Sequence, residues 1–288
     1  MAPNGLFVSD VDGTLVDRKA RLSAGTRARL GALLEQGLPF TVASARSAFS
    51  LRVMLKDLPL KLPVIEFNGA FLTDLATGHR PFVRALGEGV GEHVIELADR
   101  HGLCPFVSAF DGARDRLYAG AARNLGMQWY LDDRKGLADH RLEEVADVRV
   151  GLVHQVVSLT FIAHEALLSE LHANIIQHHA ARVRLDFYEN RYSPGWHWLT
   201  VHDHRATKAV ALAELCAALN VQLADVTVFG DERNDIPMFE VAGHGVAVDN
   251  AHPELKLHAA ELIGDHETDA VVEYLERVYV PPLGARTR

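Results

Sequence analysis

Two aspartates near the amino terminus stand where a predicted strand meets a tight turn. Asp10 and Asp12 follow the apolar run of residues 5–8, and a flexible Gly13-Thr14 pair comes directly after them. Side chains alternate along a regular strand, so residues two apart share a side, and a glycine turn lets both carboxylates reach one pocket. Paired carboxylates suit a nucleophile that works beside a general acid or base. An Asx-type turn between a strand and a helix is the alternative interpretation.

Three later segments present polar groups next to predicted strands or helices. They are Ser44-Ala45-Arg46 after the stretch 40–43, Lys208 at the start of the helical pattern 208–212, and Gly230-Asp231-Glu232-Arg233-Asn234-Asp235 after the stretch 226–229. In an open parallel sheet, ligands bind at the carboxyl ends of the strands. We therefore expect the groups that follow these strands to converge on one site.

With these four motifs the sequence resembles the haloacid dehalogenase superfamily, and within it the Cof-type branch (type IIB, with a C2 cap). The combination of DxDGT and a distant GDxxND is specific, and it extends from Asp10 to Asp235. The resemblance implies a phosphatase that hydrolyses small phosphate monoesters, such as sugar phosphates. A phosphomutase of the same fold and a non-catalytic protein that binds a phosphorylated ligand are the alternatives.

The resemblance also implies a catalytic and metal-binding role for each acidic residue. Asp10 is expected to attack phosphorus and form an aspartyl-phosphate, while Asp12 serves as general acid and then as general base. Mg²⁺ is expected at the Asp10 carboxylate, the Asp12 backbone carbonyl and the Asp231 carboxylate, with Asp235 as a more distant or water-mediated ligand. Hard oxygen ligands of this type are those that Mg²⁺ prefers.

Four residues are expected to bind the phosphate group. The resemblance assigns this role to the Ser44 hydroxyl, the Ala45 amide, Lys208 and Asn234. A lysine is unfavourable at the positive end of a helix, so the placement of Lys208 favours a function for it. The second motif commonly reads Thr-Gly-Arg; serine keeps the hydroxyl donor, whereas alanine permits fewer backbone angles than glycine.

Three further residues have supporting roles that the sequence leaves open. Arg46 either binds substrate or anchors the start of the following helix. Asn68 and Gly69 form either a plain hairpin turn or a support close to the substrate.

Alternating predicted strands and helices indicate an α/β fold, with a Rossmann-like, doubly wound parallel-sheet core. In the first part of the chain we predict strands at 6–9, 39–43 and 63–67 and helices at 23–37 and 47–58. The interval from Ser44 to Lys208 is too long for one helix and one strand. It predicts a separate small α+β domain over residues 84–193. The resemblance implies that this domain is an inserted cap that sets substrate specificity, with the catalytic core at 1–83 and 194–288.

Composition limits the classes of function. The chain has 288 residues, 48% of them hydrophobic and 23% charged, as in a globular protein. A net charge of −9 argues against a nucleic-acid-binding face. No apolar run approaches the roughly 18 residues of a membrane span, and residues 1–4 lack a basic-then-apolar leader. We expect a cytoplasmic enzyme whose partner is a small phosphate ester; the oligomeric state stays open.

Two other groups of reactive side chains are expected to be structural. Cys104 and Cys216 lie far apart in sequence and are expected to stay unpaired. The chain has 16 histidines, including the pair His178-His179. That pair lacks the additional ligands that zinc needs, so we interpret it as structural.

Overall fold

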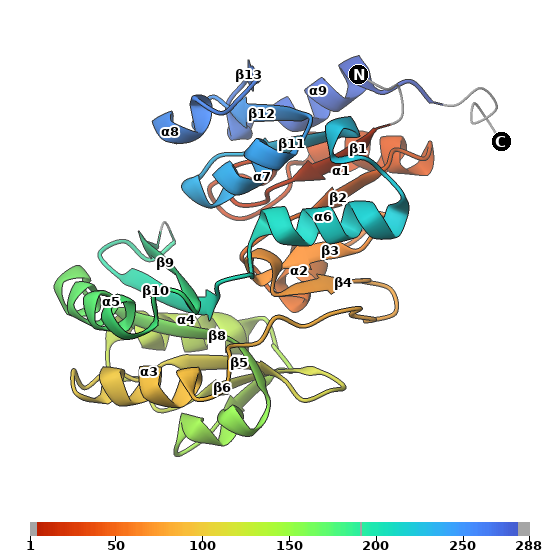
Figure 1. Ribbon diagram of the computed structural model, residues 1–288. Helices are drawn as coiled ribbons and strands as arrows, with labels where there is room; N and C mark the ends of the chain where they lie inside the picture. Colours follow the sequence, from red (N-terminus) through yellow and green to blue (C-terminus); the bar gives the residue numbers. More distant parts are fainter. Residues whose placement is uncertain (1–4, 191, 282–288) are drawn as a thin grey trace. The chain divides into compact units, whose positions relative to one another are not determined.

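The computed structural model describes residues 5–190 and 192–281, and the chain divides into two compact units (Figure 1). Residues 1–4, where a leader would begin, lie outside the described residues. The first unit comprises residues 1–82 and 207–288, and the second is Val83–Ala206. The segment 194–206, which the sequence assigned to the core, belongs to the second unit. The reason is that β10 (His197–Asp203) pairs with two strands of that unit's sheet.

The first unit is built on a five-stranded parallel sheet with the order β13-β12-β11-β1-β2. A short antiparallel hairpin, β3–β4, is attached to it through a bridge between Ala43 and Ile65. The strands are β1 (Leu6–Ser9), β2 (Phe40–Val42), β3 (Val64–Glu66), β4 (Phe71–Thr73), β11 (Val226–Gly230), β12 (His244–Val248) and β13 (Glu261–Ile263).

The central strands of this sheet are buried on both faces. All four residues of β1 and all five of β11 are buried, as expected for parallel strands covered by helices. Within this unit, α6 packs against α7 and α1 against α9 (Figure 1). The helices are α1 (Ala24–Glu35), α2 (Ala48–Met54), α6 (Lys208–Leu219), α7 (Ile236–Val241), α8 (Pro253–Lys256) and α9 (Ala270–Val278), with 3₁₀ turns η1 (Phe67–Gly69), η3 (Leu223–Asp225), η4 (Arg233–Asp235) and η5 (His266–Thr268).

Most predicted elements of the first unit are present, and α2 differs in length. The predicted helix 47–58 begins with Ser47 as its N-cap but ends at Met54. Asp57 adopts a left-handed backbone conformation (φ 74°), and Pro59 disfavours helical angles at the residue before it. The predicted cap Ser23 accepts a hydrogen bond from the Thr26 amide at the start of α1.

The sheet order places a topological switch point between β1 and β11. From β1 the chain continues to β2 on one side, and later segments add β11, β12 and β13 on the other side. At such a point the loops at the carboxyl ends of the two central strands separate and leave room for a ligand. Asp10 follows β1 and Asp231 follows β11, so the fold brings these two loops together.

The second unit contains a six-stranded sheet with the order β7-β6-β5-β8-β10-β9. Its pairs are antiparallel except for the parallel pair β6–β7. The strands are β5 (Phe106–Phe110), β6 (Asp115–Ala119), β7 (Leu142–Glu144), β8 (Gln155–Ala163), β9 (Val183–Glu189) and β10 (His197–Asp203). Its helices are α3 (Val90–Asp99), α4 (Leu125–Gly136) and α5 (Glu165–His179), with the 3₁₀ turn η2 (Val148–Val153).

Helices cover the two faces of this second sheet unequally. Apolar residues of α3 and α5, such as Val94 and Leu171, share one core cluster with Val107 of β5. Phe106, the neighbouring residue of β5, belongs instead to a smaller cluster with Met127 of α4. Because side chains alternate along a strand, α4 lies on the opposite face of the sheet from α3 and α5.

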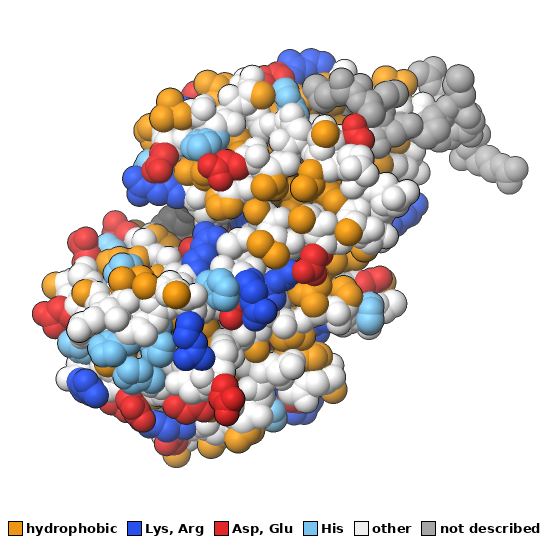
Figure 2. All heavy atoms as spheres, in the orientation of Figure 1, with side chains coloured by type: hydrophobic (Ala, Val, Ile, Leu, Met, Phe, Trp, Pro, Cys, Tyr) orange, Lys and Arg blue, Asp and Glu red, His pale blue; other side chains and the backbone are white. Residues whose placement is uncertain are grey.

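Histidine side chains gather on the surface over α3 and α5 of the second unit (Figure 2). The ring of His93 lies 5.1 Å from that of His178 and 5.0 Å from that of His179, between centroids. The Nδ1 atom of His93 lies 3.0 Å from Nε2 of His179. These contacts link α3 to α5.

None of the helices in the described part of the chain combines the length and apolar character needed to cross a membrane.

Candidate active site

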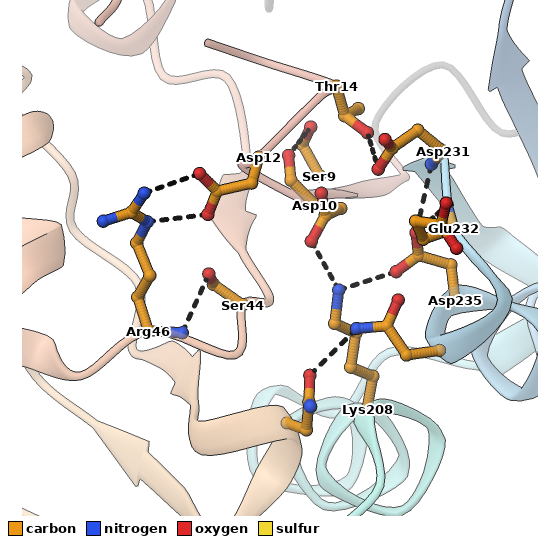
Figure 3. A network of polar contacts seen from close by, with 12 residues as sticks. Ser9, Asp10, Asp12, Thr14, Ser44, Arg46, Lys208, Asp231, Glu232 and Asp235 are labelled. Carbon is orange, nitrogen blue, oxygen red and sulfur yellow. Dashed lines mark hydrogen bonds and ion pairs between the residues drawn. The ribbon is translucent and has the colours of Figure 1, made fainter. Parts of the chain in front are cut away.

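Asp10 leaves the end of β1 and points into a buried polar cluster (Figure 3). Its amide donates to the Phe229 carbonyl at 2.9 Å, which continues the β1–β11 pairing by one residue. The residue is 6% exposed. Its carboxylate therefore lies at the switch point of the sheet, at the carboxyl end of β1.

Lys208 is the first residue of α6, and its ammonium group joins two of the acids. Its Nζ atom lies 2.5 Å from Oδ1 of Asp10 and 2.6 Å from Oδ1 of Asp235. The residue is fully buried. Burial lowers the pKa of Lys208, but the charges of Asp10 and Asp235 outweigh this effect and raise it above its ordinary value. These two acids also offset the unfavourable position of a cation at the helix amino terminus.

Asp235 holds the loop after β11 in place. One carboxylate oxygen accepts from Lys208, and the other accepts from the amides of Asp231 and Glu232 at 3.0 and 3.1 Å. Gly230 allows this packing, because a Cβ atom there would lie 2.6 Å from an Asp235 carboxylate oxygen. The absence of a side chain at Gly230 thus lets the Asp235 side chain approach the backbone closely.

Asp231 completes the acidic cluster opposite Asp10. The hydroxyl of Thr14 donates to its carboxylate at 3.3 Å, and its carbonyl accepts from the His252 amide at 2.7 Å. Asp10, Asp231 and Asp235 each have a carboxylate oxygen within 4.8 Å of the other two. Two of these three acids, Asp10 and Asp235, contact Lys208.

The charge balance of the cluster fits a divalent cation. Burial, together with the charges of Asp235 and Asp12, raises the pKa of Asp10 to about 7 in spite of Lys208. Three close, buried carboxylates and one ammonium leave an excess of negative charge that a divalent cation would neutralise. Carboxylate oxygens are the hard ligands that Mg²⁺ prefers. Asp10 and Asp231 are thus suited to hold it.

The Asp12 carboxylate turns away from this cluster and pairs with Arg46 (Figure 3). Its Oδ2 atom lies 2.6 Å from Nε of Arg46, and its Oδ1 atom lies 2.7 Å from Nη2. The turn at Gly13 (φ 82°) follows directly. The two aspartates therefore have separate surroundings, and Arg46 contacts Asp12 in addition to preceding α2.

Ser44 lies in a loop that the neighbouring hairpin holds on both sides. Its amide donates to the Ile65 carbonyl at 2.9 Å, and its own carbonyl accepts from the Asn68 amide at 2.9 Å. Its hydroxyl oxygen accepts from the Arg46 amide at 3.1 Å. A serine hydroxyl that accepts one bond still has a proton to donate. Ala45, the next residue, is exposed.

Asn68 and Gly69 tie three of the motif segments together. Phe67, Asn68 and Gly69 have φ angles of 48°, 53° and 107°, a strained run for residues other than glycine. The Asn68 side-chain oxygen accepts from the Asn234 amide at 3.2 Å. A Cβ atom on Gly69 would lie 2.3 Å from the carbonyl oxygen of Thr207, which caps α6. This turn therefore does more than reverse the chain.

Buried Glu66 anchors the same hairpin and was not identified from the sequence. Its carboxylate accepts from the Ala48 amide at the start of α2, from Thr73, and from Arg80 at 3.2 Å. The carboxylate of Glu66 is fully buried. A lone glutamate in a strand carries no sequence signal of such a network.

Asn250 is a second residue that the sequence analysis missed. Its side-chain amide donates to the Gly13 carbonyl at 2.8 Å, and its side-chain oxygen accepts from the His266 amide at 3.0 Å. It follows β12, which neighbours β11 in the sheet. No strand was predicted from the sequence at 244–248; recognising that apolar run would have pointed to the polar residues that follow it, because ligands bind at the carboxyl ends of parallel strands.

Comparison with known proteins identifies the family. A model of the haloacid dehalogenase-like hydrolase family matches residues 7–275. This chain belongs to that family. The predicted superfamily is thereby confirmed, and the chain is a hydrolase.

Curated relatives of this hydrolase are phosphatases. The chain is 23% identical to the 5-amino-6-(5-phospho-D-ribitylamino)uracil phosphatase YwtE of Bacillus subtilis, over 93% of this chain and 96% of the relative. It is 27% identical to the HMP-PP phosphatase of Cronobacter sakazakii, over 96% of this chain and 95% of the relative.

Solved structures confirm the predicted fold class of this hydrolase. A haloacid dehalogenase-like hydrolase from Bacteroides thetaiotaomicron matches with a TM-score of 0.80 at 22% identity, over 96% of this chain and 99% of that one. A sugar phosphatase of haloacid dehalogenase subclass IIB matches with a TM-score of 0.74 at 19% identity, over 95% and 98%. The parallel-sheet core and the separate α+β unit are thus those of this family.

Proposed function

We propose that this hydrolase is a Mg²⁺-dependent phosphatase that acts on small phosphate monoesters through an aspartyl-phosphate at Asp10. One observation carries the proposal: the Asp10 carboxylate lies in a buried cluster with Lys208, Asp231 and Asp235, whereas Asp12 lies apart from it. A nucleophile and an acid or base need different surroundings to do different tasks.

The proposed reaction has two steps that use the same two aspartates. An Asp10 oxygen attacks phosphorus, the bond from phosphorus to the leaving oxygen breaks, and Asp12 gives that oxygen a proton. Water then attacks the aspartyl-phosphate and loses a proton to Asp12. The bond between phosphorus and the Asp10 oxygen breaks, and inorganic phosphate leaves.

The surrounding residues are proposed to bind the phosphate oxygens. The Ser44 hydroxyl and the Ala45 amide would donate hydrogen bonds, and Lys208 would neutralise the charge that Asp10 and phosphate share. Asn234, whose amide contacts Asn68 in this structure, would add a further donor. Mg²⁺, held by Asp10 and Asp231 and by the Asp12 carbonyl, would reduce the repulsion between carboxylate and phosphate.

The second unit is proposed to act as the cap that selects the substrate. Its α+β fold and its place between Ser44 and Lys208 support this role. We further propose a cytoplasmic location, because Cys104 and Cys216 are unpaired thiols, as is usual in a reducing compartment.

Phosphate release from a panel of phosphate esters tests the proposed function. We expect turnover with Mg²⁺, abolition by EDTA and restoration by excess Mg²⁺. Turnover that persists in EDTA would contradict the metal dependence. Phosphate transfer between positions of a sugar, dependent on a bisphosphorylated activator and without net release, would instead identify a mutase.

Mg²⁺ should also stabilise the folded protein independently of activity. A ligand that binds only the folded state at 100 times its dissociation constant adds about 2.7 kcal/mol to the free energy of unfolding. We expect the thermal midpoint to rise with Mg²⁺ in the wild type and not in Asp231→Asn. An equal rise in both proteins would place the cation elsewhere.

Asn250→Ala should reduce activity without unfolding the protein. The change removes the hydrogen bonds to the Gly13 carbonyl and from the His266 amide, each worth about 1 kcal/mol of stability. A small displacement of the Asp10–Asp12 loop is expected to lower kcat/KM by roughly tenfold, since catalysis depends on precise placement. Steady-state kinetics and a thermal melt check both effects. Unchanged kcat/KM would show that the Gly13 turn keeps its shape without Asn250.

A further inference from the structure

The Asp12 carboxylate is held by a guanidinium in a two-pronged contact. Both carboxylate oxygens are engaged, one by Nε and the other by Nη2 of Arg46, at 2.6 and 2.7 Å. The two side chains are 24% and 21% exposed, so water reaches them only partly. Paired contacts of this kind fix the plane and the direction of a carboxylate more tightly than a single hydrogen bond does.

The backbone of Arg46 is held in turn by two neighbours. Its amide donates to the Ser44 hydroxyl at 3.1 Å, and its carbonyl accepts from the Phe67 amide at 3.0 Å. Phe67 belongs to the strained turn whose position Glu66 secures through α2 and Arg80. The backbone of Arg46 is therefore held in place, and its guanidinium in turn holds the Asp12 carboxylate in one position.

The Asp12 carboxylate could instead turn toward the cluster of Asp10 and Asp231, and that alternative shows why its contact with Arg46 matters. Asp12 is two residues from Asp10, and a carboxylate there has a cation-attracting cluster of Asp10 and Asp231 nearby. A carboxylate drawn into that cluster would bind the cation and could not exchange protons with the leaving oxygen or with water. Arg46 offers Asp12 a competing cationic partner outside the cluster.

We propose that Arg46 is a positioning residue for proton transfer, which holds the Asp12 carboxylate outside the cation-binding cluster and directed at the leaving oxygen. This inference rests on the proposed function, in which Asp12 gives a proton to the leaving oxygen as the bond from phosphorus to that oxygen breaks. Because Arg46 acts through Asp12, the loss of rate when Arg46 is replaced should depend on how much the leaving oxygen needs a proton.

The dependence on the leaving group separates this role from phosphate binding. A nitrophenolate leaves readily as an anion, whereas an alkoxide needs a proton. The kcat/KM value reports the steps up to cleavage of the ester bond. The experiment therefore compares kcat/KM for p-nitrophenyl phosphate and for glycerol phosphate in the wild type, Arg46→Gln, Arg46→Lys, Asp12→Asn and the double variant Asp12→Asn/Arg46→Gln.

Arg46→Gln is expected to lower kcat/KM for glycerol phosphate by about a hundredfold, the order of loss from a displaced catalytic group. The value for p-nitrophenyl phosphate should change by less than about threefold, because its leaving group needs no proton. Arg46→Lys keeps the charge but loses the planar fork, so it should show the same selective loss. The double variant should be no slower than Asp12→Asn, since Arg46 acts only through Asp12.

Arg29 provides a matched control in the same unit. It makes the same two-pronged contact, from Nε and Nη2, with Glu276 at 3.0 and 2.6 Å. Arg29→Gln should leave both kcat/KM values unchanged, and thermal melts should show that every variant is folded.

Three results would overturn the inference about Arg46. An equal loss on both esters would mean that Arg46 binds the phosphate itself. Full activity in Arg46→Lys would mean that charge alone is sufficient. A double variant slower than Asp12→Asn would give Arg46 a separate role. The proposed function is judged by the wild type alone, because metal-dependent turnover of either ester supports it whatever Arg46 does.

Discussion

Asp10→Asn is expected to lower phosphate release by at least about a thousandfold, which is the scale of loss when a covalent nucleophile is removed. The amide keeps the size of the side chain but cannot attack phosphorus to form an acyl phosphate. It also loses a carboxylate ligand for the cation. The measurement is kcat/KM for the best ester of the panel at saturating Mg²⁺.

The loss should not come from unfolding. Because the pKa of Asp10 is raised to about 7, ionising its carboxylate costs more free energy in the folded than in the unfolded protein, and this destabilisation is complete above about pH 7. Asparagine removes this cost, so without metal at pH 8 the free energy of unfolding should stay equal or increase. Asp57→Asn, at a side chain that is 71% exposed, is the control and should keep full activity. Near wild-type turnover in Asp10→Asn would eliminate Asp10 as the nucleophile.

Lys208→Met should have the largest effect on stability and a large effect on activity. Without the ammonium group, the buried carboxylates of Asp10 and Asp235 face each other unpaired. Removing one partner of a buried ion pair costs about 3–5 kcal/mol, and removing a buried donor to the reacting group costs about 10²–10³ in kcat. Urea unfolding and steady-state kinetics would measure the two effects.

An exposed lysine provides the comparison for Lys208. Lys135 pairs with Glu144 at 2.9 Å, and both side chains are about half exposed, at 47% and 58%. Lys135→Met should change the free energy of unfolding by less than about 1 kcal/mol, as exposed ion pairs do. If Lys208→Met and Lys135→Met lowered the free energy of unfolding equally, burial would not explain the stabilising effect of the Lys208 contacts.

The sequence determined the parts of this protein that depend on neighbouring residues. The strand 6–9 was found as an apolar run, and Ser23 was found as a helix cap, because both signals are local. The resemblance carried by the motifs gave the family and the α/β core with its inserted unit. The site residues named from it remain proposals, although the fold brings Asp10, Lys208, Asp231 and Asp235 together.

Only the tertiary structure decided features that depend on contacts between distant segments. The sequence assigned residues 197–203 to the core, yet the hydrogen bonds of this strand to β8 and β9 place it in the second unit. Asn250 lies 237 residues from the Gly13 carbonyl that it contacts, and Glu66 lies 18 residues from the amide that it caps. No local pattern marks such partners.

The different surroundings of the two aspartates are the clearest case. The sequence predicts that both carboxylates can reach one pocket, because the turn at Gly13 can break the alternation of a regular strand. In the folded chain, Lys208 attracts one carboxylate and Arg46 the other, at 2.5 and 2.6 Å. Spacing along the chain fixes where each side chain begins, but charges brought in by folding from 198 and 34 residues away decide where each one points.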